Sequence, residues 1–469
     1  MKIKRKKKIV GGILGVAVAV AISLCPIPAV VADVMTRNSF IALGCLVGAV
    51  VWMLLDVLPD YLATLTMCVA WVITGAVPLV TAFSTFSGST WWLLFGALCI
   101  GVAASTSGLL KRMALVMMRL FPANFRGQSL ALVLSGVVIS PLIPSTAAKS
   151  SIVAPLARSM SESMGYEPCS KPSQGMFMSF YTGYVSAGMG FLSASFISYS
   201  LVGLMPEGNE IGWFDWFLYA LPWLVVAILL MTIAIQIMYR PKNDQTVSKD
   251  VINKELSDLG PMSSKEKITL GVMLVCLVLW MLERVIGVSS AMVAVAAGIV
   301  LIGAGIFGRQ EFRAKIAWDT MVFIGTFLCI SEVFATLGIN DAVSILLGDR
   351  LAPLMSNVWL LVPVLCVVTF LIRFVVVSWT ASAVLITTIL MPLCPTYGIH
   401  PWIIAFTCYC CTNTWNVIYQ NTPYIAALVS TDNKMGTHQQ LLPFSVVYMI
   451  TCTIGCVACI PFWKLFGLC

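Results

Sequence analysis

The chain has 469 residues, of which 59% are hydrophobic and only 10% are charged, and its formal net charge is +8. Its mean hydropathy of +0.95 excludes a soluble globular domain of this size. A helix that crosses a bilayer needs about 20 mostly apolar residues, and such runs recur from Ile9 to the C-terminus. The composition therefore predicts an all-α polytopic membrane protein with about eleven transmembrane helices.

The N-terminus combines a basic stretch with a long apolar one. Residues 2–8 are mostly lysine and arginine, and an apolar run follows over 9–31. A signal peptide has the same order, but this run is long enough to span and no clear small-residue cleavage site follows it. We expect residues 1–37 to form a cytoplasmic basic N-terminus and an uncleaved first transmembrane helix.

The remaining apolar runs fall into two groups. Residues 38–239 form the first predicted repeat, with expected spans at 38–58, 61–81, 90–110, 175–204 and 213–239. The lysine-rich stretch 240–267 is the most polar part of the chain and is predicted to be a cytoplasmic linker. Residues 268–469 form the second repeat, with expected spans at 268–286, 290–308, 319–337, 401–430 and 441–467.

Two apolar regions, 128–160 and 358–394, differ from simple spans. Each is interrupted near its middle by a polar or proline-bearing cluster. Each arm is only about 15 to 20 residues long, and at about 1.5 Å of rise per residue the shorter arms reach only part-way across the bilayer. We predict that both regions are re-entrant helical hairpins.

The distribution of basic residues supports this interpretation. If both hairpins return to the side that they enter from, the basic stretches 2–8, 111–126, 240–267 and 309–315 all face the cytoplasm. If either hairpin were a full span, every later loop would change sides and the asymmetry would largely disappear.

The two halves also resemble each other in sequence. Trp91 to Gly96 leads to Gly108 in the first half, and Trp318 to Gly325 leads to Gly338 in the second. Each motif is followed by a basic or polar loop and then by a broken hairpin. The first hairpin is expected to enter from the cytoplasm and the second from outside, which makes the halves inverted-topology repeats. Such folds place substrate and ion sites near the midplane, where broken helices meet.

The hairpin tips carry hydroxyl side chains, Ser145 and Thr146 in the first and Ser378 and Thr380 in the second. At the start of each second arm the backbone amides are unpaired, and with the helix dipole they favour a carboxylate. Ser and Thr hydroxyls add donors for an anion or acceptors for a sodium ion. We predict that these four residues bind both the substrate and a coupling cation.

Two broken hairpins with tips near Ser-x-Thr-Ala, in opposite halves, resemble the divalent anion:sodium symporter family of the ion transporter superfamily. The resemblance covers nearly the whole chain from about residue 38, and the family's Ser-Asn-Thr signature aligns with Ser145-Thr146-Ala147 and Ser378-Trp379-Thr380. It implies alternating-access transport of di- or tricarboxylates or sulfate. It also implies a homodimer in which the hairpins belong to a moving transport domain.

The chain departs from this signature at both tips, because Thr146 and Trp379 stand where the family has asparagine. In such carriers these asparagines contact sodium and substrate, so the departure bears on sodium coupling and on substrate choice. Trp379 could narrow the site, stack on a ligand or serve packing.

The resemblance further implies an unwound segment after each hairpin, 186–195 in the first half and 412–423 in the second. Non-helical backbone at membrane depth is tolerated where it lines a cavity, and the alternative is that the polar side chains only hold helices together. The ligands expected in these segments are Gly188, Gly190 and Asn413 for a cation, and Asn416 and Thr422 for the substrate.

Two cations lie within the hairpins, Lys149 four residues after Ser145 and Arg373 five residues before Ser378. A charge inside a membrane segment is costly and marks a pathway or a paired site. We predict that both contribute to substrate binding, by neutralising a carboxylate or replacing a sodium ion. The alternatives are a structural pair between Arg373 and Glu332, and a Lys149 side chain that snorkels to the surface.

Other classes of function find little support. Nearly all of the sixteen cysteines lie in apolar stretches, where cysteine acts as a small hydrophobe, and Cys410-Cys411 lacks zinc-ligand spacing. No metal beyond a sodium ion is therefore expected. The sequence has no nucleophile elbow, HExxH or GxxxxGK[ST] motif, which argues against an enzyme and against an ATP-driven pump.

The sequence thus predicts a secondary active transporter of small organic anions in the cell inner (plasma) membrane. It is expected to be coupled to sodium or to anion exchange, without another cofactor and without a nucleic-acid partner. The alternatives are a sulfate transporter and a sodium/proton-type ion exchanger, for which only Glu332 and Glu283 are candidate buried acids.

Overall fold

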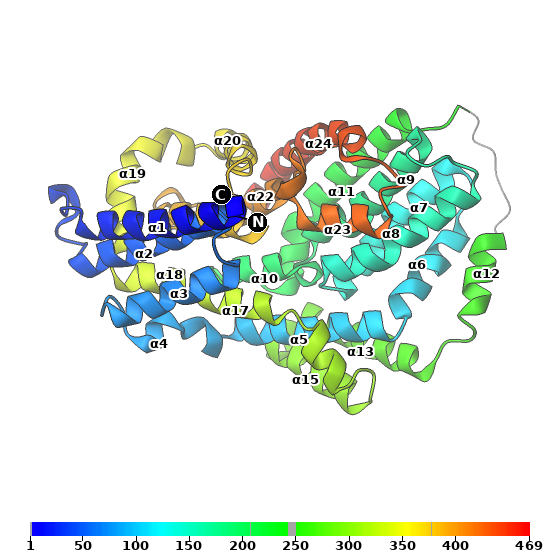
Figure 1. The fold of residues 1–469 in the computed structure, drawn as a ribbon, viewed down its shortest axis with the longest axis horizontal. Coiled ribbons are helices and arrows are strands. Elements are labelled where there is room, and N and C mark those ends of the chain that lie inside the picture. The colour runs from blue at the N-terminus through cyan, green and yellow to red at the C-terminus, as the bar shows by residue number, and fades with distance from the viewer. Residues whose placement is uncertain (1, 207, 243–249, 377) are drawn as a thin grey trace.

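The computed structural model describes residues 2–206, 208–242, 250–376 and 378–469. Within these ranges every regular element is a helix, which confirms the predicted all-α class. The molecule is elongated in Figure 1, with α1 (Lys2–Leu24) and α2 (Arg37–Leu54) packed side by side toward one end and α12 (Asp250–Asp258) toward the other.

Six helices in the described ranges are long and apolar enough to cross a membrane alone: Arg37–Leu54, Ser89–Thr106, Phe125–Leu142, Trp213–Met238, Trp318–Thr336 and His438–Leu465. A bent pair, Ile339–Met355 and Val358–Ile372, meets at 111° and could supply a seventh. The other apolar helices are shorter: Lys8–Leu24, Asp60–Ile73, Ser290–Gly303, Trp379–Leu393 and Pro401–Thr412. The expected total of about eleven spans is therefore reached only if the shorter helices are included.

The first half continues after α2 with a run of helices that contains one broken hairpin and one interrupted helix. The hairpin consists of α7 and α8, and the helix that begins as α9 gives way over 182–195 to a π turn and two short 3₁₀ turns, called the unwound segment below, before it resumes as α10. The elements are α3 (Asp60–Ile73), α4 (Leu79–Ala82), α5 (Ser89–Thr106), α6 (Leu109–Leu120), α7 (Phe125–Ile139), α8 (Thr146–Ser163), α9 (Lys171–Tyr181), α10 (Phe196–Val202) and α11 (Trp213–Met238).

The second half, which follows α12, has the same two features. Its hairpin consists of α20 and α21, and its interrupted helix runs from α22 through 413–421 to α23. The elements are α13 (Ser264–Met281), α14 (Glu283–Ile286), α15 (Ser290–Gly303), α16 (Arg309–Lys315), α17 (Trp318–Phe327), α18 (Cys329–Thr336), α19 (Ile339–Met355), α20 (Val358–Ile372), α21 (Trp379–Leu390), α22 (Pro401–Thr412), α23 (Thr422–Ser430) and α24 (His438–Leu465).

The order of elements repeats between the halves. In each half a glycine in the left-handed region starts the helix that precedes the hairpin, Gly108 (φ 85°) before α6 and Gly338 (φ 66°) before α19. Residues with a Cβ rarely adopt this conformation, which explains glycine at both positions. The matching order supports two repeats, and their inverted orientation in the membrane stays a prediction.

Several expected boundaries are wrong. The first helix ends at Leu24 rather than at residue 31, and a separate turn follows at Ala29–Val31, because Pro26 and Pro28 cannot continue a helix. The stretches expected to be loops before the two hairpins form helices instead, α6 and α19. The linker 240–267 also contains a helix, α12, and the start of α13.

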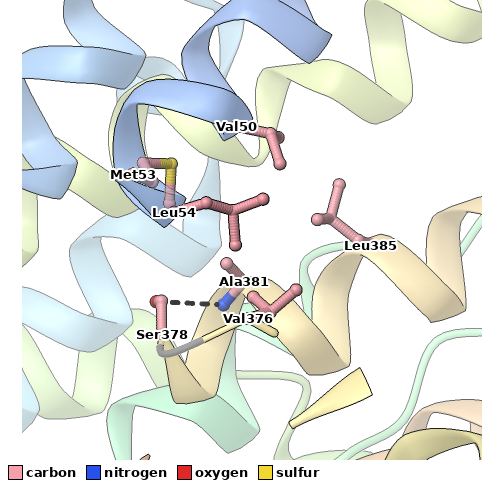
Figure 2. Close-up of a pocket in the computed structure, with 7 residues that line it drawn as sticks. All are labelled: Val50, Met53, Leu54, Val376, Ser378, Ala381 and Leu385. Carbon is pink, nitrogen blue, oxygen red and sulfur yellow. Dashed lines mark hydrogen bonds between the residues drawn. The ribbon is translucent and has the colours of Figure 1, made fainter. Parts of the chain in front are cut away.

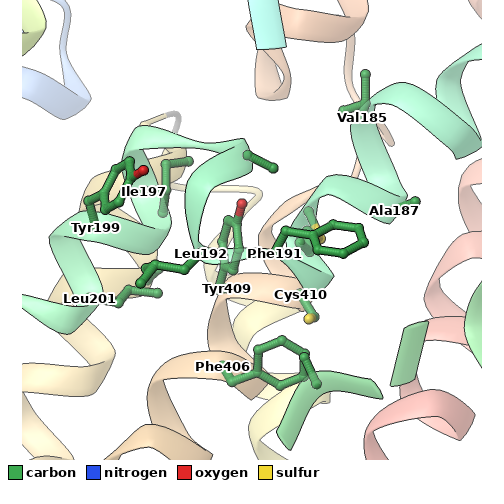
Figure 3. Packing of buried hydrophobic residues seen from close by; sticks show 14 of the residues in the cluster. Val185, Ala187, Phe191, Leu192, Ile197, Tyr199, Leu201, Phe406, Tyr409 and Cys410 are labelled. Atoms are coloured by element: carbon green, nitrogen blue, oxygen red, sulfur yellow. The ribbon is translucent and has the colours of Figure 1, made fainter. Parts of the chain in front are cut away.

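Aromatic packing joins the long helix α11 to the interrupted helix that begins as α22. The ring of Trp216 in α11 lies edge-on to those of Trp402 and Phe406 in α22, with centroids 5.6 and 5.9 Å apart, an arrangement that aromatic pairs favour. Figure 3 shows Phe406 with buried side chains of the unwound segment, including Phe191 and Leu192. The unwound backbone is therefore enclosed by core side chains rather than exposed to lipid.

Candidate binding site at the two hairpin tips

The first tip changes direction over six residues. Helix α7 ends at Ile139, a tight turn follows at Ser140–Leu142, and α8 begins at Thr146. Pro141 and Pro144 lie in the gap, where their missing N–H groups cannot extend the helix. Ser145 is the N-cap of α8, and its Oγ accepts a hydrogen bond from the backbone N–H of Ala148 over 3.2 Å. Ser145 and Thr146 are both half-buried at the predicted tip.

The second tip has the same cap. Ser378 precedes α21, and its Oγ accepts a hydrogen bond from the N–H of Ala381 over 3.4 Å. Figure 2 shows this serine below the end of α2, where Met53 and Leu54 complete a small pocket around it. Thr380 is buried one residue into the second arm's first turn. Both serines thus start the second arm of their hairpins, as the sequence predicts.

Lys149 is completely buried rather than turned to the surface. Its Nζ donates to the carbonyl oxygen of Ala194 over 3.2 Å and to Ser140 Oγ over 3.4 Å. Ala194 belongs to the unwound segment of the first half, and Ser140 closes the first arm of the hairpin. The ammonium group therefore joins both arms of the first hairpin to the neighbouring unwound backbone, and the snorkelling alternative is wrong.

Arg373 is also completely buried and makes the equivalent connection in the second half. Its Nε donates to the carbonyl oxygen of Thr412 over 3.0 Å, its Nη1 to that of Val376 over 2.7 Å, and its Nη2 to that of Gln420. Thr412 and Gln420 lie at the two ends of the unwound segment. The expected alternative partner, Glu332, is not among the acids of the four ion pairs within the described ranges.

Lys149 and Arg373 lie on opposite arms of their hairpins, at two positions that are defined relative to the capping serine. In each hairpin, one residue lies five positions before the capping serine and another lies four positions after it. These residues are Ser140 and Lys149 in the first hairpin and Arg373 and Ser382 in the second. In both hairpins the cation's nitrogen lies 3.4 Å from the serine Oγ. Each hairpin therefore holds one cation and one hydroxyl at these positions, with the cation on opposite arms.

Asn413 links the unwound segments of the two halves. Its Nδ2 donates to Ser186 Oγ over 3.1 Å, while its Oδ1 accepts hydrogen bonds from Tyr181 Oη and Asn421 Nδ2 over 2.7 and 2.8 Å. The side chain is completely buried. Because Tyr181 and Ser186 of the first half and Asn421 of the second all bond to this amide, the two segments are held in a fixed relation.

The remaining predicted ligands are divided between positions near the tips and positions away from them. A Cβ on Gly188 would lie 3.5 Å from Lys149 Nζ, so this glycine faces the first cation, whereas Gly190 faces Leu224 of α11. Asn416 donates to the sulfur of Met449 in α24 over 3.3 Å, and Thr422 is exposed at the start of α23. The structure therefore brings Gly188 to the site and turns Gly190 away from it.

Several residues of the network are absent from the sequence prediction. Ser140, Ser382 and Ser186 provide hydroxyl partners, and Asn421 caps α23 by accepting from the N–H of Tyr424. Asn421 had a recognisable signal, because Asn-Thr-Pro is typical of a helix start with the cap followed by proline in the first turn. The serines have no local signal, since their partners lie on other segments.

A family model described as the sodium:sulfate symporter transmembrane region matches residues 6–469. The inner membrane protein YbhI of Escherichia coli K12 is 25% identical over 344 residues, which cover 70% of this chain and 71% of YbhI. The L-tartrate/succinate antiporter of the same strain is 26% identical over 323 residues, which cover 66% of this chain and 64% of the antiporter. The chain thus spans less than two thirds of the antiporter that it matches.

Two solved structures share the fold. The YdaH transporter of Alcanivorax borkumensis aligns with a TM-score of 0.57 at 15% identity, covering 87% of this chain and 99% of YdaH. MtrF of Neisseria gonorrhoeae, which is described among antimetabolite efflux pumps, aligns with the same TM-score and identity over 81% of this chain and 83% of MtrF. At this identity the likeness concerns the fold alone, and both proteins are transporters.

Proposed function

The chain belongs to the divalent anion:sodium symporter family and is a membrane transporter rather than an enzyme; from this premise we propose that it exchanges small dicarboxylates across the bilayer without sodium. The observation that carries the proposal is the pair of buried cations. Lys149 and Arg373 each join a hairpin to the carbonyl oxygens of an unwound segment.

Carbonyl oxygens of unwound segments are the groups that hold a coupling sodium ion in folds of this kind. Here the carbonyl of Ala194 accepts from an ammonium group, and those of Thr412 and Gln420 accept from a guanidinium group. A sodium ion at these oxygens would lie beside the positively charged donors and be repelled by them. The loss of both signature asparagines, at Thr146 and Trp379, points the same way. In this proposal the side-chain cations Lys149 and Arg373 thus take the place of bound sodium ions.

The substrate class follows from the charge of the site. Two buried cations and the amide-bearing N-termini of α8 and α21 favour an anion with two negative charges. A dicarboxylate carries such charges at both ends, and in this proposal each end binds at one hairpin tip with its capping serine. The relative whose name specifies substrates, the L-tartrate/succinate antiporter, handles compounds of this class.

Exchange follows from the same charges. With an anion bound, the two cations are neutralised and the loaded site can change sides. Without the anion, the change of sides would move two uncompensated buried charges, which is costly in a membrane. The empty carrier is therefore held back, and each anion that leaves must be replaced by another before the site returns.

We propose an inner-membrane location with the basic N-terminus in the cytoplasm. YbhI is described as an inner membrane protein, and α6 is joined to the linker region by ion pairs of Lys111 with Glu255 and Arg112 with Glu266. These contacts bring Lys111 and Arg112 to the linker region, and in this proposal both stretches lie on the cytoplasmic side, as the positive-inside rule predicts. The homodimeric state implied by the family resemblance is part of this proposal.

The test is uptake of radiolabelled succinate, L-tartrate, malate, citrate and sulfate into proteoliposomes. Each anion is offered to vesicles that contain unlabelled succinate or none, in sodium or choline buffer. We expect dicarboxylate uptake that needs internal dicarboxylate and is equal in the two buffers. Uptake into vesicles without internal anion, driven by a sodium gradient, would establish symport instead. Uptake of sulfate alone would assign an inorganic anion carrier.

A further inference from the structure

Three cysteines from three different helices converge in the second half of the chain. They are Cys366 of α20, Cys411 of α22 and Cys456 of α24, and their sulfur atoms all lie within 4.8 Å of one another. All three side chains are completely buried, and none takes part in a disulfide. The three helices pack against each other pairwise, so the cluster lies at their common contact.

The spacing of the sulfurs suits a metal centre. Thiolates bind a metal at about 2.3 Å, which places the sulfurs of one site about 4 Å apart. The observed separations are therefore close to those of a loaded site and far longer than the bond of a disulfide, which is about 2 Å. Small rotations of the side chains are enough to bring three sulfurs around one ion.

The ligand set selects the class of ion. Sulfur ligands favour soft cations such as Cu(I) and Zn(II) over Mg²⁺ or Ca²⁺. A structural zinc site takes four ligands, whereas the sulfurs that all lie within 4.8 Å of one another are three, with no imidazole and no carboxylate among the described residues. Cys452 lies beside this group and contacts both Cys411 and Cys456. All three side chains are completely buried, so they have no contact with solvent that could supply a water as fourth ligand. Three sulfurs in a dry site match the needs of Cu(I).

We propose that Cys366, Cys411 and Cys456 form a structural Cu(I) site that fastens α20, α22 and α24 together. Two thiols lose their protons as the ion binds, and the third sulfur completes the coordination. The centre then carries one negative charge. Arg373 lies seven residues farther along the same chain segment as Cys366, about 10 Å at 1.5 Å per residue.

The position of the cluster explains what such a centre would do. Cys411 directly precedes Thr412, whose carbonyl accepts from Arg373. Cys456 lies in the helix whose Ser445 Oγ accepts from the backbone N–H of Trp415 over 3.2 Å, inside the unwound segment. A metal here holds the first arm of the second hairpin to the helix that unwinds beside it, and therefore fixes the geometry around Arg373.

The experiment measures metal binding directly and does not depend on transport. The intact protein in lipid nanodiscs is incubated without oxygen with Cu(I) held by a weak chelator, or in a separate sample with Zn(II), and the metal that remains after gel filtration is counted by mass spectrometry. X-ray absorption then reports the ligand atoms. The variants are Cys411→Ser and Cys456→Ser, and Cys276→Ser is the control because Cys276 is a buried cysteine of α13 outside the cluster.

We expect about one copper per protomer with sulfur neighbours at about 2.3 Å in the natural protein and in the control. Retained copper should fall at least fivefold in either cluster variant while the gel-filtration profile stays the same. No retained copper in the natural protein would overturn the proposal, and so would equal retention in Cys411→Ser and Cys456→Ser. Loading by Zn(II) but not by Cu(I) would overturn the choice of ion.

Discussion

The Nε of Arg373 lies 3.0 Å from the carbonyl oxygen of Thr412 and donates a hydrogen bond to it. This contact joins the end of one hairpin arm to the last residue of α22, where the helix unwinds. A hairpin and an unwound segment that share a buried ion contact are expected to move as one body.

Arg373→Gln should abolish dicarboxylate exchange, because it removes a fixed charge and frees several carbonyl oxygens. We expect the exchange rate to fall tenfold or more, because a lost interaction of about 1.4 kcal/mol already corresponds to a factor of ten. Arg350→Gln is the matched control, because Arg350 is an exposed arginine of α19. The measurement is counterflow of labelled succinate in proteoliposomes at equal protein content. Undiminished counterflow in Arg373→Gln would remove this arginine from the mechanism.

Lys149→Ala should weaken exchange and create a new dependence on sodium. The substitution frees the carbonyl oxygen of Ala194 and the hydroxyl of Ser140, both of which can coordinate a sodium ion. We expect sodium chloride, but not choline chloride, to restore part of the lost uptake. Equal rates in the two salts would show that Lys149 does not stand in place of a cation.

Ser145→Ala combined with Ser378→Ala should raise the substrate concentration needed for half-maximal exchange. Each serine caps an arm whose N-terminal amides face the proposed carboxylate position, and loss of a cap costs about 1 kcal/mol. Ser163→Ala is the control, because Ser163 ends α8 and donates to Met160 outside the tip. A double variant with unchanged kinetics would mean that the capping serines lie outside the site.

Trp379→Phe should weaken substrate binding about tenfold or more, which corresponds to one hydrogen bond to a charged group of about 1.5–3 kcal/mol. Trp379 starts α21, and its indole N–H has no hydrogen-bond partner among the described residues. A carboxylate at the tip would satisfy this donor, and phenylalanine keeps the ring but not the N–H. Trp92→Phe, at an exposed position of α5, is the control. Equal affinities for Trp379→Phe and the natural protein would assign the ring to packing.

Glu266→Gln should lower thermal stability at neutral pH and have little effect in acid. Burial acts to raise the pKa of Glu266, but hydrogen bonds from Arg112 and Ser263 outweigh it and hold the pKa below the ordinary value. A carboxyl with a lowered pKa stabilises the fold above its unfolded pKa of about 4.3, and this stabilisation is lost as the pH falls through the folded pKa.

The measurement for Glu266→Gln is the unfolding temperature of the purified protein as a function of pH. Glu255→Gln serves as the control, because the pair of Lys111 and Glu255 is more than one third exposed on both sides and such pairs contribute little. A difference between the natural protein and Glu266→Gln that stays constant into acid would contradict the assignment.

The sequence is informative about helices and tips because these depend on local patterns. Apolar runs predict membrane segments, and the serine and proline cluster at 140–146 and the polar residues that start at Ser378 predict where the hairpins break. The family resemblance, confirmed over residues 6–469, rests on the same short motifs. The positions of the hairpin tips can therefore be predicted without knowing any contact between residues distant in the sequence.

The rest of the site depends on tertiary packing, which local patterns do not encode. Lys149 meets the carbonyl of a residue 45 positions away, and Asn413 meets Ser186 across 227 positions. Glu332 is a chemically reasonable partner for Arg373, but backbone carbonyls of the unwound segment take its hydrogen bonds instead. Carbonyl oxygens exist at every residue, so a sequence cannot show which of them face a charge.

The opposite placement of the two cations has a consequence for comparing relatives. Position 149 of the first hairpin corresponds to Ser382 of the second, and position 140 corresponds to Arg373. An alignment of the two hairpins that scores one column at a time therefore records two mismatches, although each hairpin carries one positive charge. A search for relatives that share the proposed independence of sodium should therefore ask whether a cation stands in either member of a column pair. Duplicated halves can drift apart in residue identity while the electrostatic pattern that they build together stays the same.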